Sequence, residues 1–223
     1  MDYKLTSLQK KDLKKGPVVL IILDGVGIGP NNNSNAIYKA KTPFLDSLIK
    51  SPLYTQLKAH GKAVGMPSDS DMGNSEVGHN TLGAGRVFEQ GSALVKKAIE
   101  SKSIFKNKTW KEGLNYCKNN TLHFIGVLSD GNVHNHIDYQ LALINQAISE
   151  GIKKIRLHIL LDGRDVAEKS ALHYLSILNK TIKNHQNNNI DIQIASGGGR
   201  MVITMDRYNA DWNMVKKGWE THV

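Results

Sequence analysis

The chain contains the stretch Leu122-His123-Phe124-Ile125-Gly126-Val127-Leu128, followed directly by Ser129-Asp130-Gly131-Asn132. An apolar run of this length that stops at turn-forming residues predicts a buried β-strand over 122–128. Further strands are expected at 18–23, 53–58, 155–161 and 190–195. Helices are expected at 43–50, 92–100, 138–150, 168–185 and 211–219. Because strands and helices alternate, the sequence predicts an α/β fold with mostly parallel sheets.

Polar residues gather where four of these strands should end. The four stretches are Asp24-Gly25, Ser129-Asp130-Gly131-Asn132, Asp162-Gly163-Arg164-Asp165 and Ser196-Gly197-Gly198-Gly199-Arg200. Each one alone is explained by turn formation. Ligands of parallel sheets bind outside the carboxyl ends of the strands, and arginine grips carboxylate and phosphate groups with two parallel hydrogen bonds. Four such stretches, two of them with arginine, therefore favour a site for an anionic ligand.

A serine stands where a glycine-containing loop is expected to enter a helix, in Met72-Gly73-Asn74-Ser75-Glu76-Val77-Gly78-His79. The start of a helix offers unpaired N–H groups and a positive dipole end, which suit both a nucleophilic oxygen and a phosphate. Such a serine needs a neighbouring base or a metal to activate it. The competing interpretation is a helix cap. His79, one turn later, could act as base, but a role in packing or in supporting the site residues from behind is favoured.

Composition narrows the class of protein. The 223 residues are 40% hydrophobic and 22% charged, which is ordinary for a globular protein. The net charge of +9 is the difference between 29 lysine and arginine residues and 20 aspartate and glutamate residues. Of the basic residues 24 are lysines and 5 are arginines, and the lysines are scattered along the chain, unlike those of a nucleic-acid surface. The sequence shows neither a membrane segment nor a signal peptide, so we expect a cytoplasmic protein without nucleic-acid or membrane partners. The single cysteine, Cys117, is expected to be structural.

Taken together, these residues resemble the cofactor-independent (2,3-bisphosphoglycerate-independent) phosphoglycerate mutases, metal enzymes of the alkaline phosphatase superfamily. The resemblance runs from Pro17 to Val223 and rests on an ordered set of motifs. They are Leu23-Asp24-Gly25-Val26-Gly27, the stretch from Gly73 to Asn80, the stretch from Ser129 to His136, Asp162-Gly163-Arg164-Asp165, Gly199-Arg200 and Met205-Asp206-Arg207-Tyr208. The resemblance implies part of an alkaline phosphatase-like domain over 1–91, followed by an incomplete inserted α/β domain over 92–223.

The resemblance also implies roles for individual residues. Asp24 and Ser75 match two ligands of one manganese ion, and oxygen ligands suit Mn²⁺. Ser75 also matches the serine that is phosphorylated during turnover, and Asp165 matches the general acid or base on the glycerate hydroxyls. Contacts to phosphoglycerate are implied for His134, Arg164, Asp165, Arg200 and Arg207. The implied reaction interconverts 3-phosphoglycerate and 2-phosphoglycerate in glycolysis and gluconeogenesis through a phosphoserine, with the complete enzyme a monomer.

Members of this family are much longer than 223 residues. The resemblance therefore implies that most ligands of a pair of manganese ions lie beyond Val223, and we expect the chain to be truncated and inactive alone. Two alternatives stay open: a non-catalytic phosphoglycerate-binding fragment, and a metal-dependent phosphate or sulfate ester hydrolase of the same superfamily. The Asp162-Gly163-Arg164-Asp165 and Met205-Asp206-Arg207 stretches favour the mutase over the hydrolase.

Overall fold

The computed structural model describes residues 16–204 and 211–223 and divides the chain into two units, Met1–Thr55 and Gln56–Val223. The first unit contains the helices α1 (Ala36–Lys39) and α2 (Pro43–Ile49). Helix α2 confirms the helix expected at 43–50: proline occupies its first position, and Thr42 Oγ1 donates to Asp46 Oδ1 at 2.9 Å. The domain boundary predicted at residue 91 falls within the second unit, at the start of α4 (Gly91–Glu100), and stays a prediction.

The strands expected at 18–23 and 53–58 were wrong, since neither segment forms a strand. The side chains from Val18 to Leu23 are 44% to 90% exposed, and Leu53 is 91% exposed. A strand needs a neighbour to pair its backbone N–H and C=O groups. The described part of the first unit contains no strand, so the apolar run has no partner to pair with and forms neither a strand nor a helix. Asp24 consequently sits in a turn, closed by a hydrogen bond from Val26 N to Leu23 O at 3.1 Å, rather than at the end of a buried strand.

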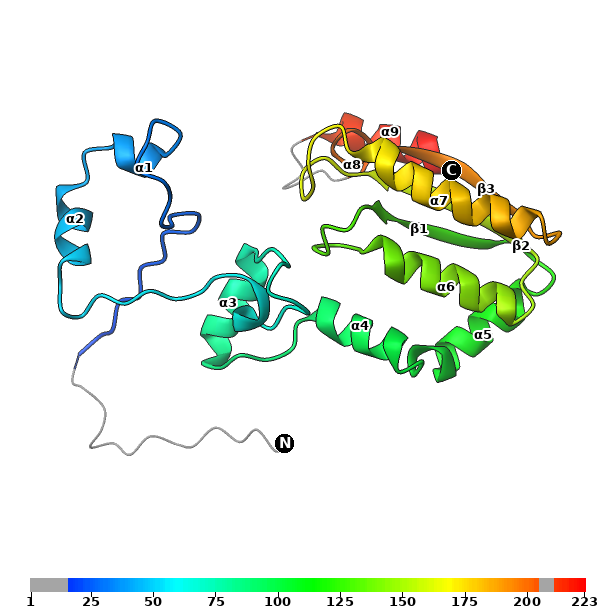
Figure 1. Cartoon of the computed structure of the whole chain (residues 1–223), viewed down its shortest axis with the longest axis horizontal. Coiled ribbons are helices and arrows are strands. Elements are labelled where there is room, and N and C mark those ends of the chain that lie inside the picture. The colour runs from blue at the N-terminus through cyan, green and yellow to red at the C-terminus, as the bar shows by residue number, and fades with distance from the viewer. Residues whose placement is uncertain (1–15, 205–210) are drawn as a thin grey trace. The chain divides into compact units, whose positions relative to one another are not determined.

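The second unit is built on a three-stranded parallel sheet (Figure 1). Its strands are β1 (Leu122–Leu128), β2 (Lys154–Leu161) and β3 (Asp191–Gly199), in that spatial order. The crossover helices are α6 (Ile137–Ser149) and α7 (Ala171–Gln186). Leu128 pairs with Leu161, and Leu161 pairs with Gly199. All three carboxyl ends therefore lie at one edge of the sheet, as the alternation of elements predicted.

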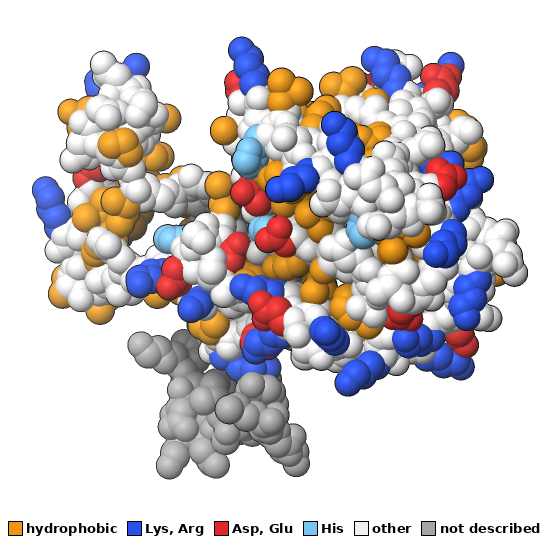
Figure 2. Space-filling model, turned by 45° about the vertical axis from the view of Figure 1, so that its right-hand side comes forward, with side chains coloured by type: hydrophobic (Ala, Val, Ile, Leu, Met, Phe, Trp, Pro, Cys, Tyr) orange, Lys and Arg blue, Asp and Glu red, His pale blue; other side chains and the backbone are white. Residues whose placement is uncertain are grey.

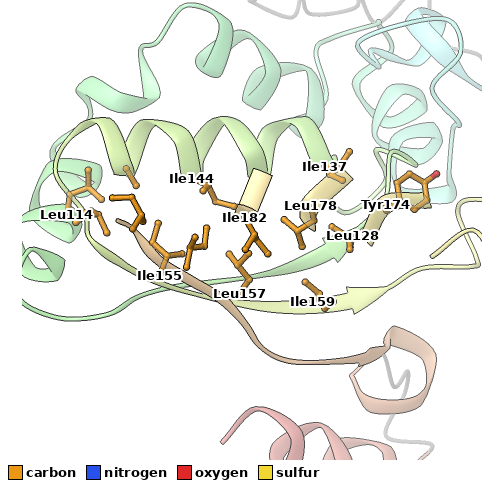
Figure 3. Close-up of a cluster of buried hydrophobic side chains, with 14 residues drawn as sticks. Leu114, Leu128, Ile137, Ile144, Ile155, Leu157, Ile159, Tyr174, Leu178 and Ile182 are labelled. Atoms are coloured by element: carbon orange, nitrogen blue, oxygen red, sulfur yellow. The ribbon is translucent and has the colours of Figure 1, made fainter. Parts of the chain in front are cut away.

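The main core lies between the sheet and one layer of helices (Figure 3). Ile144 of α6, Leu178 of α7 and Leu157 of β2 are completely buried there. Helix α5 (Lys108–Cys117) contributes Leu114, and half-buried Cys117 packs against the same core. Each fully buried side chain of this size contributes roughly 1.5–3 kcal/mol relative to exposure. This packing fixes the sheet edge on which the site is built.

The opposite face of the sheet carries α8 (Arg200–Ile203) and α9 (Trp212–His222), which Figure 3 shows below the strands. A smaller apolar cluster joins Val127, Leu160 and Ile203 on this side. Strand β2 alternates polar and apolar residues over 154–159 and is continuously apolar only over 159–161, where both of its faces make apolar contacts. None of the helices within residues 16–204 and 211–223 combines the length and apolar character required to cross a membrane.

A separate substructure precedes the sheet and carries Ser75. It comprises the 3₁₀-helix η2 (Gly61–Val64), α3 (Ser75–Ala84), α4 and the 3₁₀-helix η3 (Ile104–Lys106). Val64, Met66 and Val77 form a small core that ties η2 to α3. Gly65 takes φ +83°, and a Cβ there would lie 1.7 Å from Phe88 O, so only glycine fits where Gln90 N donates to Gly65 O at 2.9 Å.

Candidate functional site

The carboxyl ends of β1 and β2 are joined by the side chain of Asp162. Ser129 Oγ donates to Asp162 Oδ2 at 2.6 Å. Asp162 Oδ1 accepts three backbone N–H groups, from Gly163, Arg164 and Asp165, at 2.9, 3.0 and 3.1 Å. Burial raises the pKa of Asp162, but the hydrogen bonds from Ser129, Arg164 and Asp165 and the charge of Arg200 outweigh it and lower the pKa. Asp162 is therefore a buried carboxylate that shapes the following loop.

Arg200 brings the end of β3 to the same place. Its Nη1 lies 2.6 Å from Asp165 Oδ2 and 3.5 Å from Asp162 Oδ1, and its side chain is 2% exposed. Among the described residues, Arg200 Nε is a buried donor without a hydrogen-bond partner. The structure thus brings together Asp165 and Arg200 of the predicted site. It adds Asp162, which the sequence argument placed in a turn but not in the site; an aspartate directly after a strand and before glycine was the signal for it.

A polar cavity of about 470 Å³ opens at this edge, where the loop 67–72 faces the ends of β1 and β2. Asp165 is the predicted site residue that lines it. Its other lining residues include three more carboxylates, an ammonium and an imidazole, from Asp71, Asp130, Asp138, Lys96 and His136. A cavity that mixes charged groups with hydroxyls from two segments distant in sequence can hold a small polar ligand.

Hydrogen bonds fix the walls of this cavity. Tyr174 Oη donates to Asp130 Oδ1 at 2.6 Å, and burial together with this bond raises the pKa of Tyr174 to about 12. Asn132 Nδ2 donates to Asp71 Oδ1 at 2.8 Å, across 61 residues of sequence. Burial also raises the pKa of Tyr139, against a hydrogen bond from Asn132 that lowers it. The contacts of Tyr174 with Asp130 and of Asn132 with Asp71 could not be anticipated from local sequence, because their partners lie 44 and 61 residues apart.

Ser75 is the first residue of α3, and its side chain is exposed. The cap of this helix is Asn74, whose side chain accepts from Val77 N at 3.0 Å, so the helix does not need Ser75 as its cap. His79 Nδ1 lies 2.7 Å from Ser75 O and 3.2 Å from Ser75 Oγ. A nitrogen so close to a carbonyl oxygen must carry the proton and has no lone pair for the hydroxyl. This geometry argues against His79 as the base that activates Ser75.

The other predicted site residues are dispersed. Arg164 is exposed, and its Nη1 lies 3.8 Å from Met201 Sδ, beside Arg200 in sequence. His134 is exposed in the loop after β1. Asp24 belongs to the first unit and Ser75 to the second, so the predicted metal pair is divided between the units. Arg207 lies outside the described residues.

The described residues offer few donors for the predicted metal. Manganese favours octahedral coordination by oxygen ligands, about six in all. Asp24 and Ser75 supply only two of these. In residues 16–204 and 211–223, no group of three or more His, Cys, Asp or Glu side chains is placed to hold an ion. This part of the chain therefore does not fit a complete metal site.

The sequence and the fold were compared with known proteins. Residues 95–223 match the family model "BPG-independent PGAM N-terminus". A probable 2,3-bisphosphoglycerate-independent phosphoglycerate mutase of Leptospira interrogans is 56% identical over 219 residues, which cover 96% of this chain and 40% of the relative. The mutase of Trypanosoma brucei brucei is 46% identical over 222 residues, 98% of this chain and 40% of the relative.

A solved structure shares the fold. Crystal structures of Leishmania mexicana phosphoglycerate mutase at low cobalt concentration match with a TM-score of 0.84 and 45% sequence identity. The match covers 89% of this chain and 37% of that chain. This chain spans about 40% of the length of the curated relatives it matches.

Proposed function

Because this chain belongs to the family of 2,3-bisphosphoglycerate-independent phosphoglycerate mutases, we propose that it supplies the nucleophile and substrate contacts for the interconversion of 3-phosphoglycerate and 2-phosphoglycerate. The observation that carries this proposal is the convergence of the three strand ends on the Asp162, Asp165 and Arg200 side chains beside a polar cavity. Such an arrangement suits a small anionic substrate that carries hydroxyl groups.

In the proposed reaction, Ser75 attacks and later leaves as the alkoxide: its Oγ forms a bond to phosphorus while the bond from phosphorus to the substrate oxygen breaks. Glycerate and a phosphoserine result. The second hydroxyl of glycerate then attacks the phosphoserine, and Ser75 Oγ is released. Asp165 gives a proton to the oxygen that leaves and takes a proton from the hydroxyl that attacks.

Substrate binding is proposed for the arginines and one histidine of the predicted site: Arg164, Arg200, Arg207 and His134. Arg200 is held by two carboxylates, and its buried Nε has no hydrogen-bond partner among the described residues, which leaves a donor of this guanidinium to be satisfied. Arg164 is exposed on the loop that Asp162 shapes, so its guanidinium can reach an anionic ligand from solvent. Two differently buried arginines would suit the two anionic ends of a phosphoglycerate.

We also propose that the complete enzyme binds divalent metal, with manganese as the ion and Asp24 and Ser75 as two of its ligands. When bound, such an ion lowers the pKa of a hydroxyl that it coordinates. The cobalt-containing crystals of the Leishmania mexicana enzyme support a divalent ion in general. For a polypeptide of residues 1–223 alone, we propose phosphoglycerate binding without turnover, since two oxygen ligands rarely retain a catalytic ion.

The remaining proposals concern setting and organisation. We propose a cytoplasmic enzyme, monomeric when complete, with domains over 1–91 and 92–223. The start of the family match at residue 95 supports this boundary. On the face shown in Figure 2, lysine and arginine side chains are scattered among acidic and neutral ones, which supports a protein without a nucleic-acid surface.

The test uses a chimera in which residues 1–223 are joined to the remaining C-terminal portion of the Leptospira interrogans relative. We expect the chimera with Mn²⁺ to convert 3-phosphoglycerate to 2-phosphoglycerate in an enolase-coupled assay, and its Ser75→Ala variant to show no turnover. We expect the 223-residue polypeptide to show no turnover in the same assay but to bind 3-phosphoglycerate weakly by calorimetry. An inactive chimera that folds, or an active Ser75→Ala variant, would contradict the proposal.

A further inference from the structure

Asn132 has an unusual backbone conformation for a buried residue. It lies in the loop after β1 with φ +55°, and its side chain is 4% exposed. Glycine adopts this left-handed region at the lowest conformational free energy, and asparagine is tolerated there. A turn alone does not account for the burial of an amide, since a buried polar group must be hydrogen-bonded. The side chain of Asn132 therefore has a partner of its own.

Besides its hydrogen bond to Tyr139, Asn132 has a partner in Asp71, four residues before Ser75. Asn132 Nδ2 donates to Asp71 Oδ1 at 2.8 Å. Asp71 Oδ2 accepts from Ser68 N at 2.7 Å and from Ser68 Oγ at 2.8 Å. Burial raises the pKa of Asp71, but the hydrogen bonds from Asn132 and Ser68, with the nearby charge of His136, lower it overall. The acceptor is thus a carboxylate at neutral pH, and such hydrogen bonds are about twice as strong as neutral ones.

The segment that carries Asp71 is firmly connected to α3. Gly61 N donates to Asp71 O at 3.1 Å, and Met66 N donates to Gly61 O at 3.1 Å, so segment 61–72 closes on itself. Val64 and Met66 then pack against Val77, on the first turns of α3. The position of Asp71 is therefore coupled to the position of the start of α3, where Ser75 lies.

The loop that carries Asn132 is just as closely connected to Asp165. A Cβ on Gly131 would lie 2.9 Å from Asp165 Cβ, so the two backbones are in close contact. Asp71, Asn132 and Asp165 also line the same cavity. The Asp71–Asn132 hydrogen bond joins the part of the chain that carries Ser75 to the part that carries Asp165.

We propose that Asn132 and Asp71 form a latch that seats segment 61–72, and with it the start of α3, on the carboxyl edge of the sheet. Asn132 and Asp71 are positioning residues, because they act through the segments they join. The latch itself is independent of the proposed function. Only its bearing on the meeting of Ser75 with Asp165 rests on that function.

The test measures amide hydrogen exchange in the 223-residue chain. The exchange rates of each segment give the free energy of its local opening. Asn132→Gly keeps the left-handed backbone and removes the amide. We expect exchange of the Gly61 and Met66 amides to accelerate about tenfold, as loss of a hydrogen bond to a charged acceptor implies. Amides of the β1–β2 pairing should be unchanged. Asn189→Gly is the matched control, since Asn189 has φ +60° and is exposed; it should leave segment 61–72 unaffected.

A reciprocal exchange separates a specific latch from general destabilisation. Asn132→Asp places two carboxylates together and should accelerate exchange in segment 61–72 more than Asn132→Gly. Asp71→Asn in the same chain restores a complementary pair and should return exchange to within about threefold of the original. Unchanged exchange in Asn132→Asp, acceleration that spreads equally through the β-strands, or failure of the double variant to recover would overturn the latch. Activity is not measured, so failure of the proposed function would leave this result standing.

Discussion

Replacing Asp162 by alanine should be one of the most destabilising single changes in the second unit. The substitution removes the acceptor of four hydrogen bonds, from Ser129 and from three backbone N–H groups. It also removes one of the two carboxylates that face buried Arg200. Arg200 keeps its closer partner Asp165, so the main cost comes from the donors left without an acceptor, at about 1–3 kcal/mol for each one shielded from water and about 3–5 kcal/mol together. We expect a loss of that size in the free energy of unfolding.

The Asp162→Asn variant separates the contribution of the negative charge from that of the backbone hydrogen bonds. The amide oxygen can still accept the three backbone N–H groups, but the negative charge is lost, so we expect a smaller cost of about 1–3 kcal/mol. The assay is urea unfolding followed by far-ultraviolet circular dichroism. Glu220→Ala is the control, because Glu220 forms an exposed pair with Lys216 one turn away, worth about 0.5 kcal/mol or less. A loss below about 1 kcal/mol in Asp162→Ala would refute the inference that Asp162 joins the three strand ends.

The pH dependence of the same variants gives an independent check. The pKa of Asp162 is lowered in the folded state, so its contribution is complete above the unfolded pKa of about 3.9 and is lost as the pH falls through the folded value. The stability difference between the unchanged chain and Asp162→Asn should therefore be constant near neutral pH and shrink in acid below about pH 4. A difference that grows as the pH falls would contradict the sign of this pKa shift.

Three further predictions follow from the site and the core. In the chimera, Arg164→Lys should lower kcat/KM at least about tenfold despite its retained charge, because lysine cannot form two parallel hydrogen bonds; a near-normal value would exclude direct substrate contact. Ultraviolet titration should give Tyr174 a pKa of about 12. The stability that its hydrogen bond to Asp130 contributes should therefore be complete below about pH 10 and be lost as the pH rises further. An ordinary tyrosine pKa would contradict the buried hydrogen bond. Leu178→Ala should cost about 2–5 kcal/mol in urea unfolding, whereas Leu172→Ala on the exposed face of α7 should stay within about 0.5 kcal/mol; equal costs would contradict the assigned core.

The sheet could be predicted from the sequence because its signals are local. The run 122–128 is bounded by turn residues and forms β1 with the same limits, and the runs at 155–161 and 190–195 became β2 and β3 with shifts of a few residues. The helices at 92–100, 138–150, 168–185 and 211–219 were confirmed as α4, α6, α7 and α9. In each case the local apolar pattern agreed with the final packing.

The wrong strand at 18–23 and the unforeseen hydrogen bond of Asn132 share a physical cause, which is dependence on distant partners. The run 18–23 has the composition of a buried strand, but a strand forms only against a neighbour, and the described part of the first unit provides none. Helix α5 was missed because its lysine- and asparagine-rich surface hides the apolar positions Trp110 and Leu114, which are spaced by one turn. The hydrogen bond from Asn132 to Asp71 joins residues 61 positions apart, so no local rule could predict it.

The central claim, that Ser75 carries the phosphoryl group, can be tested directly by trapping the intermediate. The chimera would be mixed with Mn²⁺ and 3-phosphoglycerate labelled in its phosphate, quenched in acid within one turnover, and digested for mass spectrometry. We predict labelled phosphate on the peptide that contains Ser75, at a level that falls as unlabelled 2-phosphoglycerate is added, and no label in the Ser75→Ala variant. Turnover without label on that peptide, or label on another residue of an active chimera, would contradict the account.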